Sequence, residues 1–182
     1  MADVNEEIVA QYLKLVKRWL YAVDITFAVD RGHSNIDLLA YDSDNDCYYD
    51  IEVKYRSAFS LTAYTKSGKD VSEKSVEDLV GQFTWYPERD HALTSFTGGK
   101  KPRKLLITTK TMMGVRKEKR SHLETAFKKG LARTGYPHAE IWYFDDIIPA
   151  LVQHVSDSGK YNTELLQAIR MLKVYSNLDS SA

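Results

Sequence analysis

Apolar and polar residues alternate along this chain with two distinct periods, which predict where helices and strands lie. Val9, Leu13, Val16 and Leu20 recur at helical spacing and predict a first helix over about residues 4–21. The same pattern predicts strands at 24–29, 35–41, 48–55, 104–109 and 139–144, and helices from 70 to just before Pro87 and at 117–133, 147–154 and 163–175. This order of elements predicts an α/β sandwich with a mixed central sheet.

The predicted strands at 35–41 and 48–55 form a hairpin, because only a short polar segment separates them. Alternate side chains on a strand share a face, so Glu52 and Lys54 are expected to point the same way. The hairpin folds the earlier strand back beside the later one and brings Asp37 within reach of Glu52. Charged side chains are costly to bury unless they are paired, so their place on a strand face indicates a function.

Two carboxylates beside a lysine suit the hydrolysis of a phosphodiester. Asp37 and Glu52 offer hard oxygen ligands of the kind that Mg²⁺ prefers, and Mn²⁺ is the alternative ion. Such a metal ion acidifies a bound water and neutralises charge on the phosphate. Lys54 can orient the attacking water or stabilise the developing negative charge. The segment therefore predicts a metal-dependent hydrolytic site.

These residues resemble the motif of the PD-(D/E)xK nuclease superfamily, which includes restriction endonucleases, Holliday-junction resolvases, and Mrr-like and RecB-like nucleases. Asp37 matches the first acid, and Glu52-Val53-Lys54 matches the second half of the motif. Ile36 stands where the name of the motif has proline. The resemblance implies a restriction-endonuclease-like α/β/α fold, cleavage of DNA with Mg²⁺ or Mn²⁺, and a homodimer.

Two further matches extend the resemblance to residues 5–86. The family often places a glutamate on its first helix, and Glu6 has that position, with Glu7 as the neighbouring candidate. RecB-like members carry a Gln-x-x-x-Tyr element after the motif strand, which Gln82 and Tyr86 reproduce. On one helix these two residues would stack at i and i+4. The resemblance thus implies that Glu6 supports the metal and that Gln82 belongs to the site.

The charges of the chain are balanced overall but unevenly distributed. Lys and Arg number 25, as do Asp and Glu, yet residues 100–133 hold 12 bases and only two acids. Such a basic region can bind a polyanion, although a solvated loop and helix face explains the charge equally well. Two basic clusters stand out: Lys100, Lys101, Arg103 and Lys104, then Arg116, Lys117, Lys119 and Arg120. The candidate DNA contacts are Arg56, Tyr86, Lys100, Lys101, Arg103, Arg116 and Lys117.

Length and composition favour one globular domain over residues 1–182, with the motif in 5–86 and a basic and helical region in 100–176. Hydrophobic residues make up 43% and charged residues 27% of the 182 residues, and no apolar run approaches the roughly 20 needed to cross a bilayer. A single cysteine, Cys47, excludes an internal disulfide. We therefore expect a cytoplasmic protein without a membrane partner.

Two alternatives to a nuclease stay open. The first is a catalytically inactive nucleic-acid-binding or assembly module of the same fold. The second is a different enzyme or a metal-binding protein on another α/β scaffold. For the homodimer, the last predicted helix offers an apolar face of four residues: Leu165, Leu166, Ile169 and Leu172.

Overall fold

The structure is a computed structural model that describes residues 3–55 and 71–179, with only the backbone of 71–75 and 176–179. The elements, in chain order, are α1 (Val4–Tyr12), the π-helical turn η1 (Leu13–Lys17), β1 (Leu20–Val29), β2 (Gly32–Asp42), β3 (Cys47–Val53), α2 (Val71–Thr84), α3 (Pro87–Thr97), β4 (Arg103–Thr108), α4 (Lys110–Met113), α5 (Lys117–Arg133), β5 (Glu140–Tyr143), α6 (Phe144–His154) and α7 (Glu164–Asp179).

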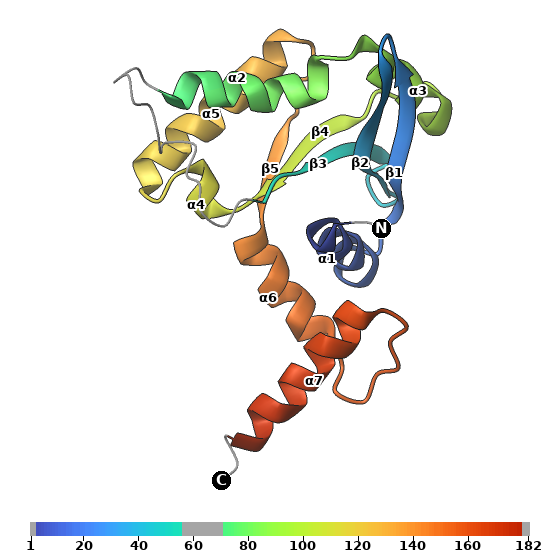
Figure 1. Cartoon of the computed structure of the whole chain (residues 1–182), viewed down its shortest axis with the longest axis vertical. Helices are drawn as coiled ribbons and strands as arrows, with labels where there is room; N and C mark the ends of the chain where they lie inside the picture. The colour runs from blue at the N-terminus through green and yellow to red at the C-terminus, as the bar shows by residue number, and fades with distance from the viewer. Residues whose placement is uncertain (1–2, 56–70, 180–182) are drawn as a thin grey trace.

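The five described strands form one mixed sheet in the order β1-β2-β3-β4-β5 (Figure 1). The β1–β2 and β2–β3 pairs are antiparallel, whereas β3–β4 and β4–β5 are parallel. The parallel pairs need helical crossovers, which α2, α3 and α5 supply. The mixed α/β sheet predicted from the sequence is confirmed.

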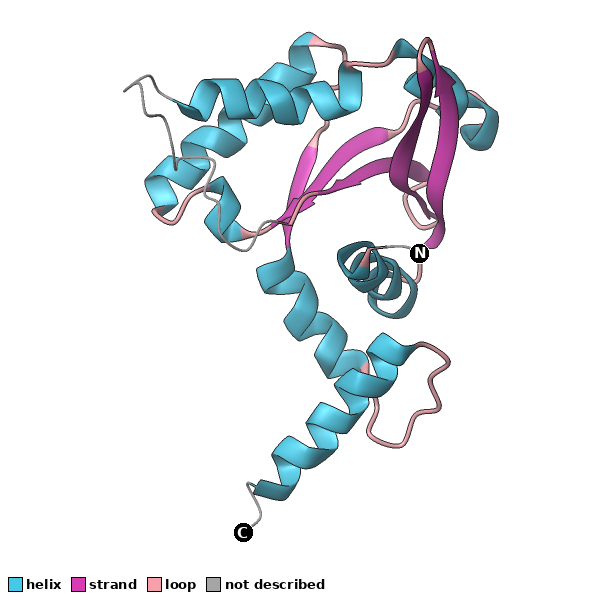
Figure 2. Ribbon diagram, in the orientation of Figure 1, coloured by secondary structure: helices cyan, strands magenta, loops and turns pink. Residues whose placement is uncertain are grey.

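Helices cover both faces of the sheet, as the ribbon in Figure 2 shows. On one face Ile51, Val53 and Ile107 pack against residues of α1 and α6. On the other face Leu106 packs against α2 and α5, through residues such as Phe83. The strand residues alternate between these two cores, so the strand that carries Glu52 has the two-sided burial that its sequence pattern predicts.

The first helix ends earlier than predicted. The helical spacing placed its end near residue 21, but Arg18 adopts a left-handed conformation (φ 59°) that terminates the π-helical turn. β1 then begins at Leu20, so the predicted strand at 24–29 is too short at its start. Leu20 is 70% exposed, which shows that it matched the helical spacing by coincidence.

Two short helices were not predicted. The sequence predicts only that a helix ends before Pro87, but Pro87 also starts α3. Proline fits the first turn of a helix because its missing N–H needs no partner there. Thr109 caps α4 by accepting a hydrogen bond from the Met112 N–H (3.0 Å). The helix predicted at 117–133 is confirmed as α5. β2 begins at Gly32, so the predicted strand at 35–41 is too short at its start.

The apolar face predicted on the last helix is partly used within the chain. Leu166 is buried against Leu151 and Val155, the first of them on α6, and Ile169 packs on the same cluster. Leu172 is 70% exposed, and Met171 and Tyr175 are also exposed. α6 and α7 project from the rest of the molecule in Figure 1. No helix in the described ranges is long and apolar enough to span a bilayer.

Candidate active site

Asp37 lies where β2 and β3 separate. The two strands pair from Asp42 opposite Cys47 to Leu38 opposite Ile51, and the same register would place Asp37 opposite Glu52. Instead the ladder ends, and Asp37 Oδ2 accepts a hydrogen bond from the Val53 N–H (2.7 Å). The carboxylate thus occupies the place of a backbone partner at the fork between the strands. Its other oxygen, Oδ1, accepts no hydrogen bond from the described residues.

An irregularity in β1 accompanies this fork. Asp24 has a positive φ of 53° and interrupts the β1–β2 ladder directly beside Asp37. Asp tolerates this conformation better than most residues, and here its Oδ1 accepts a hydrogen bond from Asn35 Nδ2 (2.7 Å). Beyond it, Ile36 packs in a different core cluster from Leu38. The change in direction of β2 frees Asp37 to turn toward β3.

Glu52 and Lys54 meet next to this fork. Lys54 Nζ lies 2.6 Å from Glu52 Oε1, with the Lys54 side chain 32% exposed and that of Glu52 only 5%. Lys54 follows β3 directly, and its N–H donates to the Ile107 carbonyl of β4 (2.8 Å), which holds the residue in line with the sheet. The carboxylate is therefore buried, whereas the ammonium group reaches solvent.

Arg89 is the residue of this site that sequence reasoning missed. Its guanidinium is almost fully buried and donates to both oxygens of Asp50 (2.6 and 3.0 Å) and to Glu52 Oε2 (3.1 Å). Its remaining nitrogen donates to the Gln82 carbonyl (3.1 Å). The planar group suits this task because its donors have a fixed fork geometry. Arg89 therefore ties α2 and α3 to the motif strand and fixes one oxygen of Glu52.

Lys104, predicted to be part of a surface DNA-binding cluster, is instead completely buried. Its Nζ donates to Asp50 Oδ2 (2.8 Å) and Asp90 Oδ1 (3.0 Å), and Asp90 also accepts a hydrogen bond from the Tyr136 hydroxyl. A buried lysine needs such partners because an unpaired charge in the interior is very costly. Lys104 thus completes an ionic network under the site and is not available to DNA.

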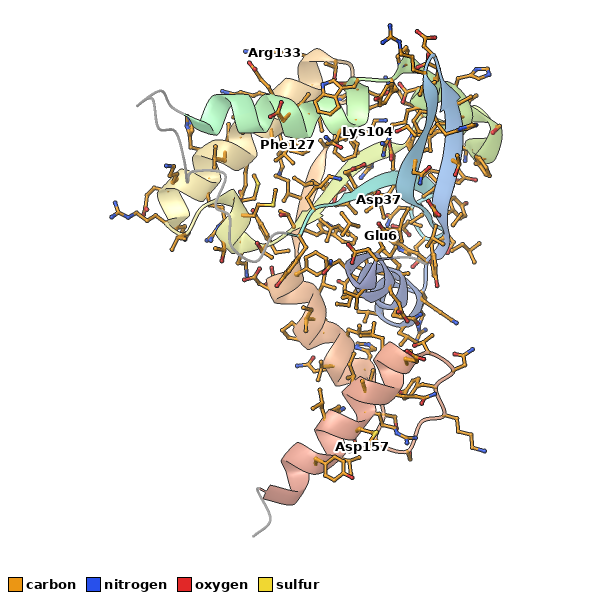
Figure 3. All side chains as sticks on the ribbon, in the orientation of Figure 1. Glu6, Asp37, Lys104, Phe127, Arg133 and Asp157 are labelled. Carbon is orange, nitrogen blue, oxygen red and sulfur yellow. The ribbon has the colours of Figure 1, made fainter. Side chains whose placement is uncertain are left out.

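Glu6 lies near the same fork, on α1 in the helical layer that α1 and α6 form. It lies on the first turn of α1, and in Figure 3 it is next to Asp37. Burial raises the pKa of Glu6, and the negative charges of Asp37 and Asp3 raise it further. This electrostatic coupling to Asp37 favours Glu6 over Glu7 as the helix carboxylate of the site.

The carboxylates of the fork repel one another. Burial raises the pKa of Asp37, and it outweighs the hydrogen bond from Val53 and the charges of Lys54 and Arg89. Burial also raises the pKa of Glu52, with the charge of Asp37 as the second cause. Burial acts on Asp50 in the same direction, but Lys104 and Arg89 hold its pKa below the usual range. The positive charges of Lys54 and Arg89 therefore do not offset the burial of the fork carboxylates, whereas Lys104 and Arg89 do offset that of Asp50.

The oxygen atoms at the fork could hold a divalent cation. Asp37, Glu52 and Glu6 supply carboxylates, and hard cations prefer such oxygen ligands. Across the described residues, no group of three His, Cys, Asp or Glu side chains is gathered closely enough to hold a metal ion. Glu52 Oε1 pairs with the Lys54 ammonium, so a metal ion on that oxygen would compete with Lys54.

The other predicted site residues do not lie with the charged side chains at the fork. Gln82 contacts it only through its main-chain oxygen. Tyr86 lies beyond the end of α2, at the extended residue before α3, so the predicted helical stacking of Gln82 on Tyr86 is wrong. At the same helix end Trp85 is 54% exposed, whereas Phe83 is buried. Arg56 lies outside the described residues.

The two basic clusters differ in their surroundings. In the first, Lys100 pairs with Asp46 (2.5 Å), Lys101 donates to the Gly135 carbonyl (3.0 Å), and Arg103 lies near Glu140 (3.6 Å). In the second, Arg116, Lys117 and Lys119 are exposed, and their side chains make no ion pair with the described residues. The second cluster is therefore the better candidate for an external anion.

No protein-family model matches the chain, and no match is found among curated proteins. The chemistry of the site is therefore inferred from its own residues.

Removing the positive charge of Lys104 is predicted to destabilise the fold. Lys104→Met removes one of the two buried cations that pair with Asp50, together with the ion pair to Asp90, and should lower the free energy of unfolding by about 3–5 kcal/mol. Urea denaturation with a shared slope measures this difference. Lys100→Met is the matched control, because its pair with Asp46 is exposed and should matter little. Equal midpoints for the two variants would contradict the role of the network.

The pKa shifts predict opposite pH dependences for two Asp→Asn variants in metal-free buffer. The raised pKa of Asp37 means that its contribution to stability is present below the unfolded pKa of about 3.8 and is lost as pH rises through the folded value. Asp37→Asn keeps an acceptor for Val53 and should gain melting temperature over wild type between about pH 4 and pH 8.

The lowered pKa of Asp50 has the reverse sign: its contribution is present above the unfolded pKa and is lost as pH falls through the folded value. Asp50→Asn should therefore melt well below wild type at neutral pH, with a deficit that shrinks toward acid pH. Thermal melting across this range measures both. The same pH trend in the two variants would contradict the assigned electrostatics.

Proposed function

We propose that the chain is a metal-dependent DNA nuclease with a restriction-endonuclease-like fold. The observation that carries the proposal is the convergence of Asp37, Glu52 and Lys54 at the fork between β2 and β3. The mixed sheet between two helical layers provides a compatible frame. The carboxylates of Asp37 and Glu52 repel each other. A cation bound between them would reduce this repulsion.

Asp37 and Glu52 would hold Mg²⁺ or Mn²⁺, with Glu6 supporting the ion from α1. All three would bind the ion through carboxylate oxygens, and Glu52 Oε1 would exchange its pairing with Lys54 for the ion. When bound, the ion acidifies water and neutralises charge on the phosphate. Arg89 donates to Glu52 Oε2 (3.1 Å) and so limits the orientations that the Glu52 carboxylate can adopt.

Lys54 has the position and exposure needed to act on a substrate. Its ammonium group is partly exposed and lies 2.6 Å from Glu52. Once that carboxylate is engaged elsewhere, the three N–H donors of Lys54 can orient a water molecule or offset charge on the phosphate. Arg89 cannot replace it, because its donors are already committed to Asp50, Glu52 and Gln82.

DNA would contact the basic start of α5, where Arg116 and Lys117 are exposed. Phosphate contacts of this kind give affinity without base specificity. A homodimer would place two such sites on two strands, and Met171, Leu172 and Tyr175 on α7 supply exposed apolar area for it. The alternative of a catalytically inactive binding module shares all of these features except turnover.

Cleavage of plasmid DNA separates the nuclease from the inactive module. With Mn²⁺, the wild-type protein should nick DNA, and Lys54→Ala should lower the rate by about 100-fold or more, because the donor aimed at the reacting phosphate is lost. Gel analysis of supercoiled and branched DNA gives the rates. Lys160→Ala, an exposed lysine in the α6–α7 loop, should cleave normally. Absence of cleavage by the wild type on every DNA form would refute the proposal.

Metal binding should separate from catalysis. Calorimetric titration with Mn²⁺ is predicted to show binding by wild type and by Lys54→Ala, and loss of that binding in Asp37→Ala and Glu52→Ala, which lack an oxygen ligand. Lys54→Ala should bind at least as tightly, since the cation that competes for Glu52 is gone. Unchanged titrations in both carboxylate variants would favour a different protein class.

A further inference from the structure

A groove between α2 and α5 lies outside the candidate active site. Its volume is about 640 Å³, within the range of ligand sites, and none of its lining residues belongs to the fork or to the ionic network. The two helices lie side by side (Figure 1), and their close approach depends on Gly130, where a Cβ would stand 2.7 Å from the Val80 side chain. Val76, Val80 and Ala126 give the groove an apolar floor.

An exposed indole forms one wall of this groove. Trp85 is 54% exposed and lies against the backbone of Gly81, where a Cβ would stand 2.1 Å from the ring. Glycine inside a helix costs about 1 kcal/mol relative to alanine, so it needs a reason at this position. Here it lets the indole lie close against the helix, with much of its surface open to the groove. Such an aromatic surface is a stacking platform for a base.

Free positive charge forms the opposite wall. Lys129 and Arg133 of α5 are exposed and line the groove, and their side chains have no ion-pair partner among the described residues. His122 and one acid, Glu77, complete the polar lining. Arg133 lies at the outer edge of this helical layer, away from Asp37 and Glu6 (Figure 3). The groove therefore combines an aromatic platform with cations spaced along one helix.

We propose that the α2–α5 groove binds single-stranded DNA, with an unpaired base stacked on Trp85 and its phosphates against Lys129 and Arg133. Base stacking on an aromatic side chain combined with backbone contacts from cations is the chemistry by which proteins hold single strands. Fully paired DNA has no free base for the indole. As a statement about substrate this rests on the proposed nuclease function, and it names DNA with an unpaired segment as the preferred class.

Binding in EDTA tests the groove without any cleavage. Fluorescence anisotropy of a labelled oligothymidylate and of a blunt duplex should show tighter binding of the single strand by wild type. Trp85→Ala should weaken single-strand binding by about 10-fold or more and change duplex binding little. Lys129→Ala should lower the slope of log affinity against log salt by about 0.7, the loss of one phosphate contact.

Two variants provide matched controls. Phe96→Ala removes an aromatic side chain of nearly the same exposure, 53%, from α3 outside the groove, and Lys160→Ala removes an exposed lysine of the α6–α7 loop. Both should bind as wild type. Equal affinity of Trp85→Ala and wild type, or equal weakening by Phe96→Ala, would overturn the proposal. Gly81→Ala serves as a second route, because it displaces the indole while favouring the helix, and unchanged binding there would also count against the groove.

The outcome for the groove is distinguishable from the outcome for the nuclease. Suppose that cleavage depends on Lys54 but single-strand binding is the same in Trp85→Ala and wild type. This result would refute the proposed groove and leave the proposed nuclease intact. If single-strand binding depends on Trp85 but the protein cleaves no DNA, the nuclease proposal is refuted and the groove proposal is supported.

Discussion

The buried ion pairing of Asp50 with Arg89 and Lys104 is the interaction on which the rest of the structure depends. It places two cations under the motif strand, joins α3 and β4 to β3, and holds one oxygen of Glu52 in a fixed direction. Burying these groups is worthwhile only because each is paired, since loss of one partner leaves an uncompensated charge in the interior. The network thus acts as the rigid base of the site, and the fork above it can carry an excess of negative charge.

That excess is the basis of the cation site proposed at the fork. The same two residues, Arg89 and Lys104, satisfy Asp50 fully but leave Asp37 and Glu52 with raised pKa values caused first by burial. Perturbed groups of this kind cluster at functional sites because function needs charges that folding alone would avoid. The carboxylates of the fork are therefore expected to weaken the metal-free fold, and in the proposed function a divalent ion would offset that cost.

Much of this architecture could be predicted because it is periodic. The hairpin carrying Asp37 and Glu52 and the helix at Lys117–Arg133 follow from local pattern alone. Arg89 was missed because Pro87 predicts only the end of a helix, and Lys104 was assigned to a basic surface cluster because Lys100, Lys101 and Arg103 precede it. The better signal for Lys104 was the apolar run that follows it. The left-handed Arg18 and the irregular Asp24 have no comparable signal, since backbone conformation there is set by packing.

The most direct test of the central claim is a crystal structure of the protein soaked with Mn²⁺, with anomalous scattering measured to locate the ion. The account predicts an anomalous peak at the β2–β3 fork, within about 2.0–2.6 Å of oxygen atoms of Asp37 and Glu52, with Arg89 still bound to Asp50. A fork without an ion, with the two carboxylates turned away from each other, would contradict it.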